Sequence, residues 1–193
     1  AMVAAAAAAS RGRARRRDGS RGAAARELRL RTSWCPRPSP PRAAARALLR
    51  NRIKAALIAG QGLAQVDANK AAAMGYCFGG MCVLELARSG ADIAGVVSIH
   101  GIFSPGDVSN EEIKAKVLCL HGHDDPMVPP DQVLAFEAEM TEAGADWQVH
   151  AYGNTMHAFT NPAANNPDFG TMYKEVAEKR TYQSLANFLE EVF

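Results

Sequence analysis

The stretch that decides the fold is Gly75-Tyr76-Cys77-Phe78-Gly79-Gly80, which lies between an apolar strand pattern and an apolar helix pattern. A Gly-x-Cys-x-Gly run in this position is typical of a nucleophile elbow, with sulfur in place of the usual serine oxygen. The turn is tight, and Gly75 and Gly79 let the strand and the helix pass close to it without Cβ clashes. We therefore expect Cys77 at the top of a sheet, facing the positive end of a helix.

The alternative for Cys77 is a buried, inert core cysteine, which is the usual state of an unpaired Cys. Two later segments favour a reactive one: residues 121–129 contain Asp125, and residues 156–159 contain His157. The three side chains follow the chain order nucleophile, acid, histidine of α/β-hydrolases. Each comes just after a strand-like run, where the loops of a parallel sheet meet, so we expect a Cys-His-Asp triad.

Composition limits the class of protein. The chain has 193 residues and a hydrophobic content of 48%, as expected of one globular domain of ordinary size. No run of about 18 uncharged apolar residues occurs, so we expect no transmembrane helix. The cysteines lack the spacing of a disulfide framework or a structural zinc site, and reduced thiols predict a cytoplasmic protein. They are Cys35, Cys77, Cys82 and Cys119.

The net charge of +2 conceals a strong asymmetry. Residues 1–50 hold 13 Arg, no Lys and a net charge of +11, whereas residues 51–193 carry −9. Two parts that differ so much are interpreted separately. We predict that residues 1–42 are an Ala/Arg-rich segment that is disordered or foreign to the fold, and that residues 43–193 are the folded domain.

Three interpretations of the basic segment remain open. It would serve as a basic arm for nucleic acid or an acidic surface, or as an organelle transit peptide, which is rich in Arg and Ser and poor in acids. The third interpretation is a sequence artefact: GC-rich coding sequence translated in the wrong frame yields many Arg residues and no Lys, because most Arg codons are GC-rich and Lys codons are not. Residues 27–34 alternate as a half-buried strand would, and the four prolines within 36–41 then forbid regular structure.

Helix-like and strand-like patterns alternate along residues 43–193. We expect helices at 43–59, 79–89, 129–144 and 173–193, and strands at 70–76, 93–100, 116–121 and 146–152. Residues 93–100 are almost continuously apolar, as in a strand with helices on both faces. The alternation predicts an α/β fold of three αβα layers around a mostly parallel sheet.

These motifs together resemble the dienelactone hydrolase, or carboxymethylenebutenolidase, family. The resemblance covers about residues 51–193 and rests on residues 75–80, 97–101, 122–129 and 157–159. It implies an α/β-hydrolase fold and a triad of Cys77, His157 and Asp125. It also implies hydrolysis of an enol-lactone ring to an oxo-dicarboxylic acid, without metal or organic cofactor.

The chain departs from the family pattern in three respects. Family members carry further N-terminal strands, including the one whose loop supplies a second oxyanion donor, so we expect an N-terminally truncated fold. A glutamate from that region, which contacts the resting cysteine in the family, has no counterpart here. The founding enzymes hold the substrate carboxylate with an arginine shortly after the histidine, where this chain has Asn161. The natural substrate therefore stays open.

The expected chemistry is hydrolysis of an ester or lactone. Cys77 would attack the carbonyl carbon as a thiolate and form a thioacyl-enzyme. His157 would take the proton and then activate water, while Asp125 orients the imidazole. The backbone N–H of Phe78 would donate to the oxyanion. The expected partner is a small ester or lactone, with no role for nucleic acid or membrane.

Alternatives exist for each histidine and acid. Asp125 precedes a proline and would also suit a plain turn; Asp124 is the neighbouring candidate, but the family register selects Asp125. His100, His121 and His123 lie near strand ends, as metal ligands do. No Cys or carboxylate spacing completes a ligand set with them, so we expect no metal.

A competing function is a hydrolase-like domain without turnover that acts as an interaction module. If the family strand beside residues 70–76 is missing, that strand becomes an exposed edge, which would allow self-association. A redox role for Cys77 lacks a resolving cysteine at CxxC spacing. Cys82 and Cys119 are expected in the core.

Overall fold

The computed structural model describes residues 2–4, 42–106 and 108–193. The strand expected at 27–34 therefore lies outside the described residues. The described chain forms a five-stranded sheet in which neighbouring strands are parallel and follow one another in chain order. The strands are β1 (Met2–Ala4), β2 (Ala72–Tyr76), β3 (Gly95–Ile99), β4 (Lys116–Gly122) and β5 (Trp147–Tyr152).

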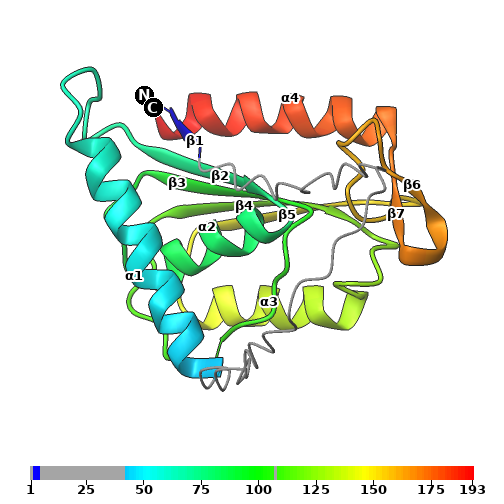
Figure 1. The fold of residues 1–193 in the computed structure, drawn as a ribbon, viewed down its shortest axis with the longest axis horizontal. Helices are drawn as coiled ribbons and strands as arrows, with labels where there is room; N and C mark the ends of the chain where they lie inside the picture. Colours follow the sequence, from blue (N-terminus) through cyan, green and yellow to red (C-terminus); the bar gives the residue numbers. More distant parts are fainter. Residues whose placement is uncertain (1, 5–41, 107) are drawn as a thin grey trace, which may run out of the picture.

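Helices cover both faces of this sheet. They are α1 (Arg42–Gln61), α2 (Phe78–Arg88), α3 (Pro130–Glu142) and α4 (Glu175–Val192). Figure 1 shows α1, α2 and α3 on one face and α4 on the other. The predicted three-layer architecture is confirmed, as are the elements expected in residues 43–193, to within a few residues at their ends. Within the described ranges, each helix is too short or too polar to cross a bilayer.

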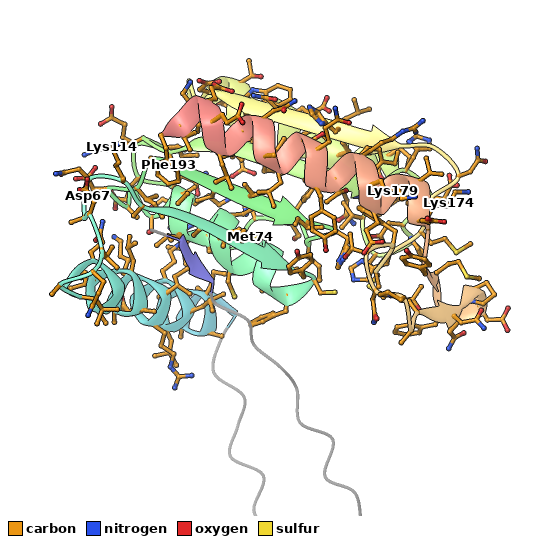
Figure 2. The ribbon with its side chains drawn as sticks, turned by 90° about the horizontal axis from the view of Figure 1, so that it is seen from above. Asp67, Met74, Lys114, Lys174, Lys179 and Phe193 are labelled. Atoms are coloured by element: carbon orange, nitrogen blue, oxygen red, sulfur yellow. The ribbon has the colours of Figure 1, made fainter. Side chains whose placement is uncertain are left out.

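The central strands carry side chains alternately to the two faces. Val96 and Val117 are fully buried in the core beneath α2 and α3, whereas Val97 and Leu118 are buried in the core beneath α4. Figure 2 shows α4 lying along the sheet, with Lys174 at one end and Phe193 at the other. Because helices cover both faces, β3 is apolar on both sides, which explains the continuous apolar pattern of residues 93–100.

The first strand changes the expected edge of the sheet. β1 pairs with β2 in parallel, with Met2 opposite Ala72 and Ala4 opposite Met74. The expectation that the strand before the elbow is an open edge is therefore wrong for residues 72–74. The reason is that three residues of the N-terminal segment, for which the sequence predicted no place in the fold, occupy this edge. The edge position expected of residues 72–74 thus passes to β1, the outermost strand on this side of the described sheet.

A group of buried charges joins the helices on the α1 side. Glu85 of α2 is fully buried and accepts from Arg50 at 2.8 Å and from Arg88 at 3.0 Å, and it lies 3.2 Å from Arg46. Arg88 also binds Glu139 of α3 at 2.7 Å. A buried carboxylate is tolerated only when it is paired in this way, so the group sets how α1 and α3 lie against α2.

Candidate functional site

Four candidate side chains follow four neighbouring strands. Cys77 comes directly after β2, His100 after β3, Asp125 after β4 and His157 after β5. Because the strands are parallel, all four residues gather at the carboxyl edge of the sheet, which is where ligands bind in open α/β folds.

The elbow at Cys77 has the strained geometry that the hexapeptide predicts. Cys77 has φ 52° and ψ −118°, a positive φ that is unusual for a residue other than glycine. A Cβ atom at Gly75 would collide with the backbone of Gly79, so the strand and the helix meet too closely for a larger residue. The Cys77 N–H donates to the carbonyl of Ile99 at 3.1 Å, and the residue is partly exposed. The sulfur is therefore held at the turn but is not sealed in the core.

The helix behind the elbow begins without a capping side chain. Cys77 occupies the N-cap position of α2 and makes no side-chain cap hydrogen bond. Helix geometry leaves the first backbone N–H groups, beginning at Phe78, without partners inside the helix. These groups carry the positive end of the helix dipole, and the helix begins directly after Cys77. This is a suitable arrangement for a developing negative charge.

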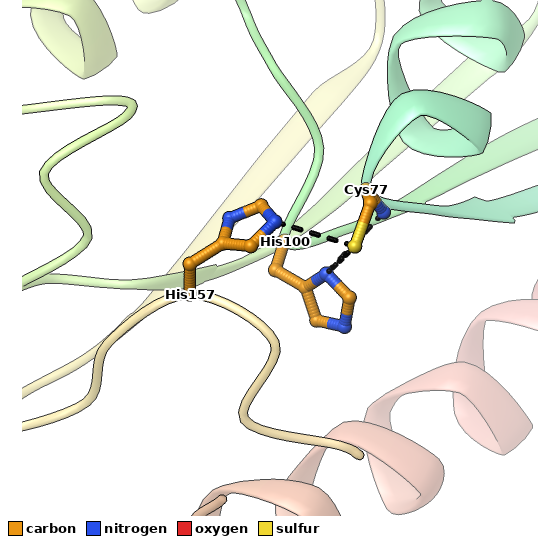
Figure 3. Close-up of side chains that lie close together, drawn as sticks. All are labelled: Cys77, His100 and His157. Carbon is orange, nitrogen blue, oxygen red and sulfur yellow. Dashed lines mark hydrogen bonds between the residues drawn. The ribbon is translucent and has the colours of Figure 1, made fainter. Parts of the chain in front are cut away.

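His157 lies on the opposite side of the sulfur from the helix. Its Nε2 is 3.2 Å from Cys77 Sγ, and its Nδ1–H donates to the Asp125 carboxylate at 2.7 Å (Figure 3 shows the contact with sulfur). The backbone of His157 is fixed by the segment that follows it: its N–H donates to the Gly170 carbonyl at 2.9 Å, and its carbonyl accepts from Met172 at 3.1 Å. The loop therefore holds the ring in place.

That segment is more regular than expected. No helix or strand was expected between residues 152 and 173, but the chain forms a small hairpin beyond His157 with a single turn of 3-10 helix. The elements are β6 (Asn165–Asn166), η1 (Pro167–Phe169) and β7 (Thr171–Met172). Each strand of the hairpin has only two residues, and Asn165 and Asn166 are polar and exposed, so apolar periodicity gave no signal for it.

Asp125 fulfils both roles considered for it from the sequence. Its Oδ1 accepts the backbone N–H of Met127 at 2.8 Å, as in a turn, and its Oδ2 accepts from His157. The residue is 1% exposed. Its neighbour Asp124 is exposed and joins the two loops through its backbone, donating to the Thr155 carbonyl at 2.9 Å. The structure thus brings Asp125, and not Asp124, into the constellation.

Protonation of His157 is governed by these neighbours. Burial disfavours its imidazolium, but the hydrogen bonds to Asp125 and to Cys77, together with their charges, outweigh burial and raise the pKa of His157 to about 9. His157 therefore holds a proton at neutral pH. A protonated imidazole beside sulfur is the arrangement that favours a thiolate nucleophile.

His100 is a second imidazole at the same sulfur. Its Nδ1 is 3.3 Å from Cys77 Sγ and also 3.3 Å from the Cys77 backbone nitrogen (Figure 3). That N–H is shared between the Ile99 carbonyl and Nδ1, which assigns the ring proton to Nε2, the nitrogen 2.9 Å from Thr160 Oγ1. Burial, and then the charge of His157, lower the pKa of His100 to about 3, so this ring is neutral.

The sequence patterns alone did not predict that His100 lies beside the sulfur. A signal for it exists: His100 directly follows β3, and the register pairs Ile99 with Tyr76, the residue before Cys77. Pairing the expected strands in register would have placed the two side chains together. His100 also has φ 39°, which marks a constrained turn at this point.

The remaining histidines and cysteines lie outside this group. His121 is buried and its ring nitrogens have no protein hydrogen-bond partner, whereas His123 is exposed. Cys119 is fully buried, as expected, but Cys82 is only half-buried, so the core assignment was wrong for it. Burial raises the pKa of the Cys82 thiol, and the charges of Arg46 and Glu85 lie nearby.

A cavity adjoins the elbow on the side of α1. Its volume is about 550 Å³, and it begins one residue beyond the nucleophile, at Phe78. Its walls combine apolar side chains with two arginines, from α1, the start of α2 and the segment after β3. The lining residues are Ala45, Arg46, Leu48, Leu49, Arg52, Phe78, Met81, Ser104, Pro105 and Gly106.

Comparison with known sequences agrees with this geometry. The profile of the dienelactone hydrolase family matches residues 41–193. An uncharacterized protein of Caenorhabditis elegans is 36% identical over 149 residues, which cover 75% of this chain and 94% of that protein. The carboxymethylenebutenolidase homolog of Mus musculus is 28% identical over 99 residues, which cover 50% of this chain and 40% of that protein.

Solved structures of dienelactone hydrolase-like proteins share the fold of this chain. A dienelactone hydrolase-like promiscuous phosphotriesterase from metagenomic libraries has a TM-score of 0.72 and 39% identity, over 78% of this chain and 64% of that one. The structure named m3DLH has a TM-score of 0.71 and 37% identity, over 78% of this chain and 63% of that one. The chain therefore spans less than two thirds of these two proteins. On its sequence profile and its fold together, the chain belongs to the dienelactone hydrolase family.

Proposed function

We propose that the protein hydrolyses a carboxylic ester or enol-lactone through a triad of Cys77, His157 and Asp125. The observation that carries the proposal is the chain of two contacts, 3.2 Å from sulfur to Nε2 and 2.7 Å from Nδ1 to the carboxylate. Membership of the family supports hydrolase chemistry in general. The partial exposure of Cys77 supports access of a substrate to the sulfur.

In the proposed reaction, the Cys77 thiolate attacks the carbonyl carbon and the carbonyl oxygen gains the negative charge. The tetrahedral intermediate collapses, the C–O bond to the leaving group breaks, and His157 gives its proton to the leaving oxygen. His157 then takes a proton from water, which attacks the thioacyl carbon and releases the acid and the thiolate. Asp125 keeps the imidazole in the tautomer that both steps need.

Stabilisation of the oxyanion is assigned to the N-terminus of α2. The backbone N–H of Phe78 has no partner inside the helix by its position, and it lies next to the nucleophile in the chain. Losing one such donor typically reduces the rate by roughly 10²–10³. The contribution of this N–H therefore sets how effective the site is.

The substrate group remote from the reacting carbonyl is assigned to the cavity beside Phe78. Asn161 stands where the family's founding enzymes hold a carboxylate with arginine, but its side chain accepts from the Ala163 N–H at 3.0 Å and is exposed. Arg46 is paired with the buried Glu85, so Arg52 is the cation of the cavity that is directed to solvent. We expect Arg52 to favour esters with an anionic group.

The decisive experiment measures hydrolysis of p-nitrophenyl acetate. The wild-type protein is expected to turn over, and Cys77→Ala and His157→Ala are each expected to reduce kcat/KM by at least about 10³-fold, as in other nucleophile–base pairs. Cys82→Ala is the matched control, because Cys82 is a half-buried thiol on α2 outside the triad. Turnover that survives Cys77→Ala would contradict the proposal.

A companion measurement tests the assignment of the cavity. Arg52→Ala is expected to raise KM about two- to fivefold for an ester with a distal carboxylate, as an exposed charge pair would, and to leave KM for p-nitrophenyl acetate unchanged. Arg180→Ala, on the exposed side of α4, serves as the charge-matched control. An equal change for both esters would remove Arg52 from substrate recognition.

The inert interaction module is the competing proposal. It predicts a folded protein that neither turns over esters nor reacts at Cys77 with iodoacetamide. Its open edge would be β1 and not residues 72–74, and the contacts of Cys77 with His157 favour the hydrolase over an inert core cysteine. Measurement of Cys77 alkylation by mass spectrometry separates the two proposals even when no natural substrate is in hand.

A further inference from the structure

Three potential metal-ligand atoms converge at the site. Cys77 Sγ lies 3.2 Å from His157 Nε2 and 3.3 Å from His100 Nδ1, and all three atoms lie within 4.8 Å of one another. Zinc bonds of about 2.3 Å to sulfur and 2.0–2.1 Å to nitrogen place tetrahedral sulfur and nitrogen ligands about 3.5 Å apart. The two sulfur–nitrogen separations therefore need to change by only a few tenths of an ångström, while the two ring nitrogens, which lie within 4.8 Å of each other, need to come to about 3.3 Å.

Both imidazoles are already oriented as metal ligands are. A ligating histidine almost always donates its other ring N–H to a carboxylate, a carbonyl or another oxygen, which fixes its tautomer. His157 donates through Nδ1 to Asp125 at 2.7 Å, and His100 donates through Nε2 to Thr160 at 2.9 Å. In each ring, the nitrogen that faces Cys77 is the one left to bind a metal.

We propose that Cys77, His100 and His157 form a three-ligand site for a thiophilic divalent cation of the zinc type, and that the bound cation inhibits the hydrolase. The partial exposure of Cys77 leaves the fourth position for water. Thiolate and imidazole ligands favour Zn²⁺ over Mg²⁺ or Ca²⁺, which require oxygen. A cation bound to the sulfur occupies the lone pair that attacks the substrate.

The charges of the site favour a dication. A metal binds thiolate and neutral imidazole, so binding displaces to solvent any proton held by sulfur or by His157 Nε2. It leaves around the cation a thiolate, two neutral imidazoles and the Asp125 carboxylate, which lies 2.7 Å behind the His157 ring. The +2 of the metal then balances one thiolate and one carboxylate, so the bound site is neutral overall. A neutral, paired arrangement suits a site whose two imidazoles are buried.

The test uses the full protein, freed of metal with a chelator and titrated with Co²⁺ as a spectroscopic substitute for Zn²⁺. We expect the visible bands of four-coordinate cobalt together with a near-ultraviolet thiolate-to-cobalt band. Cys77→Ser should remove the thiolate band. His100→Asn should weaken binding at least tenfold, since even loss of an outer partner costs about 10–100-fold.

Asparagine is chosen at position 100 because it accepts a positive φ and keeps an acceptor for the Cys77 N–H. Thr160→Val is the second variant: it leaves all three ligands in place, removes only the oxygen behind His100, and should weaken cobalt binding by about 10–100-fold. His150→Gln is the matched control, because His150 binds Ser184 of α4 and is not among the three proposed ligands, so the cobalt affinity of this variant should equal that of the wild type.

A weak, six-coordinate cobalt spectrum in the wild type, or equal affinity in the wild type and His100→Asn, would overturn the metal site. Inhibition by Zn²⁺ is then measured in ester hydrolysis, where His100→Asn should require at least about tenfold more Zn²⁺ for half-inhibition. The cobalt spectrum needs no turnover. A failed hydrolase assay would therefore leave the metal site standing, and a failed cobalt titration would leave the hydrolase proposal standing.

Discussion

The turn after β3 and the loop after β5 each bring a histidine to the same sulfur, and the two rings are opposites. His157 is backed by the carboxylate of Asp125 and has its pKa raised to about 9, whereas His100 is backed by the hydroxyl of Thr160 and has its pKa lowered to about 3. Both rings are buried and both lie within 3.3 Å of sulfur.

The two rings differ in the group that is hydrogen-bonded to the nitrogen remote from sulfur, and this group determines whether a buried ring can be protonated. A carboxylate offsets the desolvation cost of a buried imidazolium, so His157 can hold and deliver a proton. A hydroxyl does not, so His100 stays neutral and presents a lone pair to the sulfur. One side of Cys77 is thereby suited to proton transfer, and on the other side His100 Nδ1 accepts from the Cys77 backbone N–H.

The largest expected effect comes from removing the carboxylate behind His157. Asp125→Asn should reduce kcat/KM for p-nitrophenyl acetate by about 10³–10⁴-fold, because the amide no longer fixes the tautomer or stabilises the imidazolium. Steady-state kinetics provide the measurement, and Asp124→Asn, an exposed neighbour, is the control with an expected change below about twofold. Equal losses in the two variants would mean that the comparison between the rings is wrong.

A smaller effect is expected from giving His100 a carboxylate. Thr160→Asp should raise the pKa of His100 from about 3 and lower that of His157 from about 9, because two neighbouring imidazolium ions repel each other. Titration of the ring protons by NMR measures both shifts. A pKa of His100 that does not move would show that burial, and not the missing carboxylate, sets its protonation.

The smallest effect is expected in the pH dependence of stability. The pKa of folded His157 is about 9, above its ordinary 6.5, so its contribution is complete below pH 6.5 and is lost as pH rises through about 9. The pKa of folded His100 is about 3, so its contribution is present above pH 6.5 and is lost as pH falls toward 3.

Urea unfolding of the wild type, His157→Gln and His100→Asn at several pH values tests this difference. The gap in unfolding free energy between the wild type and His157→Gln should narrow from pH 6.5 to pH 9 and above, while the gap for His100→Asn should change only below pH 6.5. Parallel curves for the two variants would contradict the opposite protonation of the rings.

The elbow and the sheet were predictable because their signals are local. A nucleophile elbow needs small residues on both sides of the nucleophile, as Gly75 and Gly79 are here. Continuous apolar runs identify strands that are covered by helices on both faces. The order of Cys77, Asp125 and His157 placed each at the end of a strand, and a parallel sheet brings such ends together.

The remaining features depend on contacts between distant segments. His100 meets Cys77 through the pairing of β2 with β3, and Met2–Ala4 joins the sheet although the surrounding residues show no strand pattern. The cavity beside Phe78 arises from the placement of α1, which the buried group around Glu85 holds. No single window of sequence contains these arrangements.

The most direct test of the central claim is to trap the acyl-enzyme. The protein is mixed briefly with p-nitrophenyl acetate, quenched in acid, and examined by mass spectrometry of the intact chain and its peptides. The account predicts one acetyl group on Cys77 in the wild type, which accumulates further in Asp125→Asn if deacylation slows. Steady hydrolysis by the wild type with no acetyl group on Cys77 at any quench time would contradict it.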